Sequence, residues 1–215
     1  MRRTRMPKDT LVSALSLAAV ALTLSACDLP WTATPTAAGP EVVRTAELDD
    51  ASGRPCPRSL PVGDDPSGHG FGTTEAATDL PALRETQEAW VCEYVAVHGH
   101  SATGTVYSWV RDGSAEPVAD SDLPALREAL GALTLPDVDQ ACTDDLGPRW
   151  MVVSTHDGDL TGVVVDDYGC RAVRLTDNPH ATAPGAGGQE GTVAGVLDGG
   201  TAILDVLRIG RASGE

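Results

Sequence analysis

Two histidines separated by one glycine form the most evident pair of reactive side chains in this chain, in the run His98-Gly99-His100. Imidazoles at this spacing can lie on one face of an extended segment or chelate a metal ion from a loop, and imidazole is a ligand for Zn²⁺, Cu²⁺ and Ni²⁺. The spacing identifies no third ligand. We therefore keep His98 and His100 as candidate metal ligands, with solvated surface histidines as the alternative.

Two further histidines have carboxylates close by in the sequence. His69 follows the pair Asp64-Asp65, and His156 precedes Asp157 and Asp159. Spacing alone does not show whether these groups meet. Neighbouring carboxylates are usually solvated surface in a chain with 31 acidic and 15 basic residues, and a glycosidase pair would also need a cleft. The chain lacks a Gly-x-Ser-x-Gly motif. Enzyme activity stays open, with a non-catalytic role favoured, and no cofactor is expected.

The five cysteines divide into one near the N-terminus, Cys27, and four that follow. An even number of cysteines in an oxidising compartment predicts two disulfides. Three pairings are open, and we favour the one in which each bridge closes a segment whose ends could lie beside one strand pair. That pairing joins Cys56 to Cys92 and Cys142 to Cys170.

The N-terminus has the layout of a secretory signal, with basic residues before an apolar run at residues 11–24. The run is too short for a stable membrane-spanning helix. At its end lies the segment Leu24-Ser25-Ala26-Cys27, which resembles the lipobox of bacterial lipoproteins. The resemblance implies that residues 1–26 are removed and that a diacylglyceryl group on Cys27 anchors the protein to the extracytoplasmic face of the cell membrane. An ordinary signal peptide with a chance cysteine is the alternative.

The net charge of −16 argues against nucleic acids and anionic membrane surfaces as partners. It becomes more negative without residues 1–26, because that segment contains four basic residues and one acidic residue. Such a surface repels phosphate backbones and anionic headgroups, so we expect no nucleic-acid partner and no basic membrane-binding patch. The lipid on Cys27 is then the expected membrane contact. The oligomeric state stays open.

Composition divides the chain into a tether and one domain. Residues 27–54 hold the lipidated cysteine and a Thr-, Ala- and Pro-rich stretch without apolar periodicity, which predicts a flexible tether. Residues 55–211 have the size of a single domain, and residues 212–215 are expected to form a disordered tail.

Apolar periodicity within this domain predicts an α+β fold. Strands are expected at residues 90–97, 105–110, 150–155 and 160–165, the last two around an Asp157-Gly158 turn. A helix capped by Ser121 precedes this second hairpin, a helix over 201–209 follows it, and residues 169–173 add a further extended piece. The order strand-strand-helix-strand-strand-helix predicts an antiparallel sheet of about four strands with both helices packed on one face.

Two sequence features remain open. Residues 78–85 match residues 121–128 at seven of eight positions, which indicates either a duplication or the recurrence of a favourable helix start. Trp90, Trp109 and Trp150 are expected in the core. They would form a partner surface instead if two of the rings emerged on the uncovered face of the sheet.

The run Trp90-Val91-Cys92-Glu93-Tyr94 and the segment Tyr168-Gly169-Cys170-Arg171, together with Cys56-Pro57 and Cys142, are similar to uncharacterised secreted proteins and lipoproteins of high-GC Gram-positive bacteria. The resemblance spans most of residues 55–209. It implies that the four cysteines are structural, and no activity comes with it. We therefore expect a non-catalytic binding module for a protein, peptide or envelope component. The alternative is an envelope hydrolase or metal-binding lipoprotein that uses His98 and His100.

Overall fold

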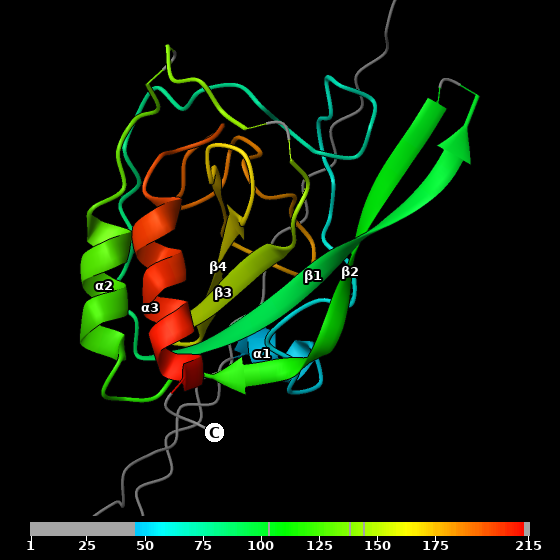
Figure 1. Ribbon diagram of the computed structural model, residues 1–215. Coiled ribbons are helices and arrows are strands. Elements are labelled where there is room, and N and C mark those ends of the chain that lie inside the picture. Colours follow the sequence, from blue (N-terminus) through cyan, green and yellow to red (C-terminus); the bar gives the residue numbers. More distant parts are fainter. Residues whose placement is uncertain (1–45, 103, 138, 144, 213–215) are drawn as a thin grey trace, which may run out of the picture. The chain divides into compact units, whose positions relative to one another are not determined.

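The computed structural model describes residues 46–102, 104–137, 139–143 and 145–212. Five strands form one antiparallel sheet in the order β2-β1-β3-β4-β5 (Figure 1). The strands are β1 Glu88–Ser101, β2 Gly104–Pro117, β3 Arg149–His156, β4 Asp159–Asp166 and β5 Val173–Thr176. The helices are α1 Ala46–Asp50, α2 Leu123–Gly131 and α3 Gly200–Ala212. The expected α+β class is confirmed. No helix of the described residues has the length and apolar composition that crossing a membrane requires.

The β3–β4 hairpin forms where its turn residues predict it. Asp157 and Gly158 have φ values of 47° and 104°. Two successive residues with positive φ are what a tight two-residue hairpin turn requires, and the pair Asp-Gly tolerates this conformation. The turn places His156 opposite Asp159 and sets the register along both strands.

Side chains that alternate in direction along the strands give the sheet two faces, and both are buried. Val152 and Val163 point to one face, where they pack with Leu126 of α2 and Ile203 of α3. Figure 1 shows these two helices next to each other, and they are in contact. Full burial of each such side chain contributes about 1.5–3 kcal/mol. The prediction that both main helices cover one face is therefore confirmed.

A loop layer covers the opposite face, which the sequence analysis left uncovered. Cys56 and Leu60 pack there against Tyr94, Trp109 and Met151. Trp109 is 1% exposed and Trp150 9% exposed, whereas Trp90 is half-buried. A partner surface made from two of these tryptophan rings is therefore ruled out, and the expectation of a core position holds for Trp109 and Trp150.

The structure differs from the expected elements at β5, at α1 and at the start of α2, and both strands of the β1–β2 hairpin are longer than expected. β5 is a fifth strand, slightly later in the chain than the extended piece expected at 169–173. α1 lies inside the segment expected to be tether, because Leu48 packs against the loop-covered core and the Leu160 amide donates to the Glu47 carboxylate. The N-cap of α2 is Asp122 instead of Ser121.

The repeated octapeptide adopts two different structures. Residues 121–128 lead into and form most of α2, whereas residues 78–85 contain no helix or strand. The first copy is followed by the β-forming residues of β1, and its Ala82 amide bonds to the Gly191 carbonyl. The two copies are therefore not a structural repeat.

Candidate functional site

The β1–β2 hairpin extends beyond the rest of the sheet. β1 pairs with β2 as far as Ser101 and Gly104, but its pairing with β3 ends where Tyr94 meets Arg149. Residues 95–100 of β1 therefore have β2 on one side and no described strand on the other. Figure 1 shows this half of the hairpin leaving the body of the domain. A register shift between Val91 and Glu93 lies at its base, and such bulges bend a strand.

The outer half of β1 is an open sheet edge. In an antiparallel pair the residues alternate in the direction of their N–H and C=O groups. Every second residue of 95–100 thus directs these groups away from β2, to the side that β3 has left. We call residues 95–100 the β1 edge. Backbone groups in such a row can pair with an added strand.

The other edge of the hairpin is covered by the chain itself. The Leu60 amide donates to the Trp109 carbonyl at 3.0 Å, and the Tyr107 amide donates to the His69 carbonyl at 2.8 Å. The Arg111 amide donates to the Arg58 carbonyl at 2.9 Å. β2 therefore bonds to the loop of residues 58–69, so that the hairpin presents its open backbone on the β1 side.

The outer part of the hairpin is uncharged in an acidic chain. Residues 94–110 contain no Asp, Glu, Lys or Arg, although these types make up 21% of the sequence. Val95 is 37% exposed and Val97 is 49% exposed, and both lie on the same face of β1. Proteins usually protect an edge of this kind with charges or proline. The β1 edge has neither protection.

His98 and His100 lie within β1 and not in the loop that the sequence analysis considered as one possibility. They are exposed and share one face of the strand, opposite Tyr107 and Thr105 of β2 respectively. Their ring centroids are 6.5 Å apart, with the rings nearly perpendicular. No group of three or more metal-ligating side chains occurs among the described residues.

The carboxylates near His69 do not join these histidines. The His69 Nδ1 atom lies 2.8 Å from the Thr105 carbonyl. Asp65 accepts hydrogen bonds from the Ser67 hydroxyl and the Gly70 amide. Burial of Asp65 works towards a higher pKa, but these bonds outweigh it and hold the pKa below its usual range. Asp65 therefore stabilises its own loop, and His69 contacts β2.

His156 lies at the other end of the sheet, in an acidic cleft that sequence reasoning missed. The cleft has a volume of about 390 Å³ and contains the carboxylates of Glu47, Asp159, Asp177 and Glu190. Arg84 bridges two of them, with 2.8 Å to Asp159 and 2.7 Å to Glu190. Residues this far apart in the chain leave no spacing signal, so only the fold brings them together.

Glu47 is the most perturbed carboxylate of this cleft. Its burial raises its pKa, the hydrogen bond from the Leu160 amide lowers it, and the negative charges of Asp159 and Asp177 raise it further, so that the net shift is upward. The imidazole of His156 is already engaged with the Glu85 carbonyl at 2.8 Å and with Asp157 at 3.2 Å. These two partners hold the His156 ring at the cleft.

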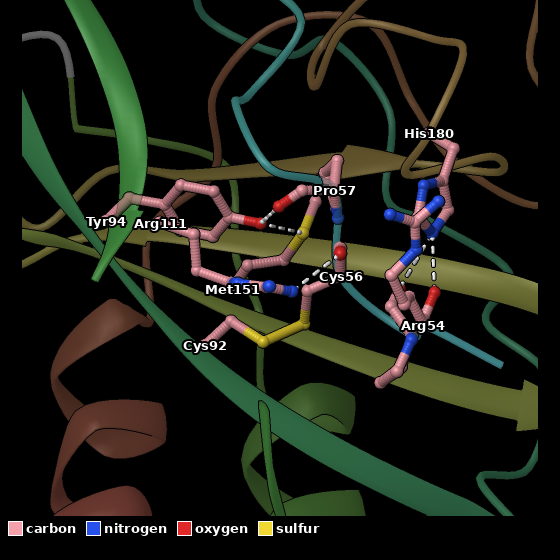
Figure 2. Close-up of a disulfide and its surroundings, with 9 residues drawn as sticks. Arg54, Cys56, Pro57, Cys92, Tyr94, Arg111, Met151 and His180 are labelled. Carbon is pink, nitrogen blue, oxygen red and sulfur yellow. Dashed lines mark hydrogen bonds between the residues drawn. A yellow bond between two sulfur atoms is a disulfide. The ribbon is translucent and has the colours of Figure 1, made fainter. Parts of the chain in front are cut away.

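The base of the hairpin is anchored by the first disulfide, shown in Figure 2. Cys56 is bonded to Cys92 of β1, and the Tyr94 hydroxyl donates to the Pro57 carbonyl at 2.8 Å. Arg111 of β2 donates to the Cys56 carbonyl at 3.0 Å. Burial raises the pKa of the Tyr94 hydroxyl well above its usual value, although Arg111 opposes the shift. This cluster holds the covering loop to both strands of the hairpin.

The second disulfide joins Cys142 to Cys170, so the structure has the pairing that the sequence analysis favoured. Cys142 is exposed, in contrast to the buried first bridge. Cys27 lies outside the described residues.

The comparisons with known proteins add no family to this picture. Searches against protein-family models, curated proteins and solved structures found no match.

Proposed function

We propose that this chain is an extracytoplasmic lipoprotein, anchored through diacylglyceryl-Cys27, whose domain binds an extended segment of another envelope polypeptide. The partner adds as a strand to the β1 edge. One observation carries this proposal: β1 continues past the end of β3 with an open backbone, two exposed valines and no charged residue. Strand addition of this kind obtains affinity from main-chain hydrogen bonds and specificity from alternate side chains.

The size of the edge predicts moderate affinity. Each main-chain hydrogen bond contributes about 0.5–1.5 kcal/mol net, and full burial of a valine side chain contributes about 1.5–3 kcal/mol. These gains must exceed the loss of translational and rotational freedom, which costs about 4–15 kcal/mol. Placing the module and its partner in the same compartment at a membrane raises the effective concentration and favours such a complex.

The charge distribution favours docking at the hairpin. The chain carries a net charge of −16, so an acidic partner is repelled over most of the surface. Residues 94–110 contain no Asp, Glu, Lys or Arg. A neutral or mildly acidic segment can therefore approach the hairpin with little electrostatic penalty.

Photo-cross-linking in the native host tests the docking site. A photoreactive amino acid is placed at Val95 or at Val97, and cross-linked peptides are identified by mass spectrometry. Strand addition predicts that the two positions cross-link to residues two apart in one extracytoplasmic protein, because side chains on one face of a strand repeat every second residue. Leu80, which is 57% exposed, serves as the control position and should give no such pair.

A matched pair of substitutions completes this test. Val97→Lys introduces a charge at the β1 edge and should abolish the cross-links from position 95, whereas Leu80→Lys should leave them unchanged. The proposal is wrong if the cross-links at 95 and 97 show no common register, or if they survive Val97→Lys.

The lipid anchor has a separate test. Mass spectrometry of the protein from host membranes should show an N-terminus at Cys27 that carries a diacylglyceryl group. Cys27→Ser should remove this mass and release the domain from the membrane fraction. An unmodified Cys27 within an uncleaved chain would contradict the proposed anchor.

A further inference from the structure

We propose that His98 and His100 form one half of a zinc site, and that a second copy of this chain, added at the β1 edge, supplies the other half. The inference rests on the proposed function, since it uses the same open edge, and it names one partner of that edge.

The first step is the geometry of the two imidazoles. His98 and His100 are two residues apart on one strand, so their side chains share a face. Both are exposed, and the ring contact that the structure records for them is with each other, at 6.5 Å between centroids. Side-chain rotation is sufficient to turn two neighbouring, exposed rings towards a common ion. Imidazole nitrogen is a preferred ligand for Zn²⁺.

The second step is that one chain leaves this site incomplete. Structural zinc sites have four protein ligands in tetrahedral arrangement. The described residues provide no third histidine, cysteine or carboxylate in a cluster with His98 and His100. Two ligands must therefore come from another molecule.

The third step is that the β1 edge can supply these ligands through two-fold symmetry. When two copies of β1 pair in antiparallel fashion about Gly99, His98 of one copy lies opposite His100 of the other. Directly opposed residues in such a pair have Cβ atoms about 4.5–5.5 Å apart and point to the same face. All four imidazoles then gather on one side of the joint, and the same surface is used by both molecules.

The fourth step is that charge favours the outer hairpin over the other surfaces as the place where two copies meet. Two chains with a net charge of −16 repel each other strongly, and the repulsion is least where residues 94–110 meet. A divalent cation at this joint adds positive charge between two acidic bodies. On the other face of the joint, Val97 of one copy lies opposite Ser101 of the other, so no charged side chain faces either valine.

Sedimentation and mass measurement of the chain with Cys27→Ser, with both disulfides formed, test the inference. We expect a monomer in EDTA and a dimer with one Zn²⁺ for every two chains. Mg²⁺ should not produce the dimer, because it prefers oxygen ligands. His98→Ala and His100→Ala should each abolish the zinc-dependent dimer. His156→Ala, at the opposite end of the sheet, is the matched control and should retain it.

Two further variants locate the joint. Val97→Lys should abolish the zinc-dependent dimer, whereas Leu80→Lys should not. A zinc-bound monomer, a dimer that persists in EDTA, or a dimer that survives loss of either histidine would overturn the inference. Cross-linking from position 95 in a host strain that carries His98→Ala separates the proposed function from the zinc site. If only the zinc-dependent dimer is wrong, the cross-link to an envelope protein persists. If strand addition itself is wrong, that cross-link is absent.

Discussion

At the scale of single residues, a buried ion cluster joins three strands of the sheet and its covering loops. Asp166 of β4 lies 2.7 Å from Arg149 and 2.9 Å from Arg174, and all three side chains are 6% exposed. Arg149 also lies over the Trp109 ring at 4.1 Å. Removing one partner from such a cluster leaves a charge in the interior without compensation.

We expect Asp166→Ala to lower the free energy of unfolding by about 3–5 kcal/mol, as for other broken buried pairs. Chemical denaturation followed by tryptophan fluorescence measures the change. Asp159→Ala removes the exposed partner of Arg84 and is the control, with an expected change of about 1 kcal/mol or less. If both variants lost the same free energy of unfolding, burial would not explain the contribution of the cluster to stability.

The acidic cleft gives a prediction for pH. The pKa of Glu47 is raised in the folded state, so its protonated form favours folding and its charged form opposes it. The favourable contribution is complete below the unfolded pKa and is lost as pH rises through the folded pKa. Glu47→Gln keeps an oxygen that can accept from the Leu160 amide but cannot ionise. It should therefore stabilise the protein at neutral pH.

Thermal unfolding of Glu47→Gln and of the unsubstituted chain across a pH series measures this effect. The advantage of the variant should be present at neutral pH, shrink as pH falls through the raised folded pKa of Glu47, and be lost below the usual carboxyl pKa. Glu128→Gln, on the exposed side of α2, is the control. A destabilised Glu47→Gln protein at neutral pH would contradict the electrostatic origin of the shift.

At the scale of the elements, the hairpins and helices follow from local sequence while their ends do not. Asp157-Gly158 specifies a two-residue turn, and the leucine stripe from Leu123 specifies α2, so both elements form where predicted. β1 was expected to end at residue 97. Residues 98–101 are polar or lack a side chain, so they lack the apolar alternation that marks a half-buried strand, yet pairing with β2 continues the ladder.

The two octapeptide copies show most clearly why local sequence is insufficient. Seven of eight residues are shared, but only residues 121–128 lead into a helix. The second copy continues into Ala129 and Leu130, which extend the apolar stripe onto the core. The first copy continues into the β-branched and aromatic residues of β1. Tertiary packing therefore decides between two outcomes of nearly the same sequence.

The two disulfides should differ in their resistance to reduction. Cys142 is exposed, whereas Cys56 and Cys92 are both 1% exposed. Mild reductant should open the Cys142–Cys170 bridge first, since a thiolate must reach the sulfur that it attacks. Differential alkylation with mass spectrometry gives the order. The opposite order, or simultaneous opening, would show that the loop layer over Cys56 opens readily.

Loss of the buried bridge should also destabilise the fold. The Cys56–Cys92 bridge closes a segment of 36 residues, and its removal by Cys56→Ser with Cys92→Ser should cost about 3–4 kcal/mol through the entropy of the unfolded chain. Denaturant titration measures this loss. A change within error of zero would mean that the loop layer holds to β1 without the covalent bond.

At the scale of the whole molecule, an acidic domain presents a hairpin whose outer part, residues 94–110, is uncharged. Composition and the spacing of His98 and His100 made the pair a candidate before the structure was considered. The open edge beside the pair could not be predicted, because it depends on where β3 stops relative to β1. The acidic cleft also required the fold, since Glu47 and Glu190 are brought together from opposite ends of the domain.

This charge distribution makes salt an informative variable. Repulsion between two acidic bodies is screened as ionic strength rises, with a Debye length of about 10 Å at 0.1 M. The zinc-dependent dimer should therefore become tighter when NaCl is added at constant free Zn²⁺. Sedimentation equilibrium at two salt concentrations measures the change. A dimer that weakens with salt would indicate contact between charged surfaces away from the hairpin.

Residue-resolved amide hydrogen exchange of the monomeric domain tests the open β1 edge most directly. The account predicts an alternating pattern along residues 95–100: amides that donate to β2 exchange slowly, and the intervening amides exchange quickly. Residues 90–94 pair with both β2 and β3 apart from the bulge between Val91 and Glu93, and their amides should be protected whichever strand they face. Uniform protection along residues 95–100 would show that another part of the chain covers the edge and would contradict the account.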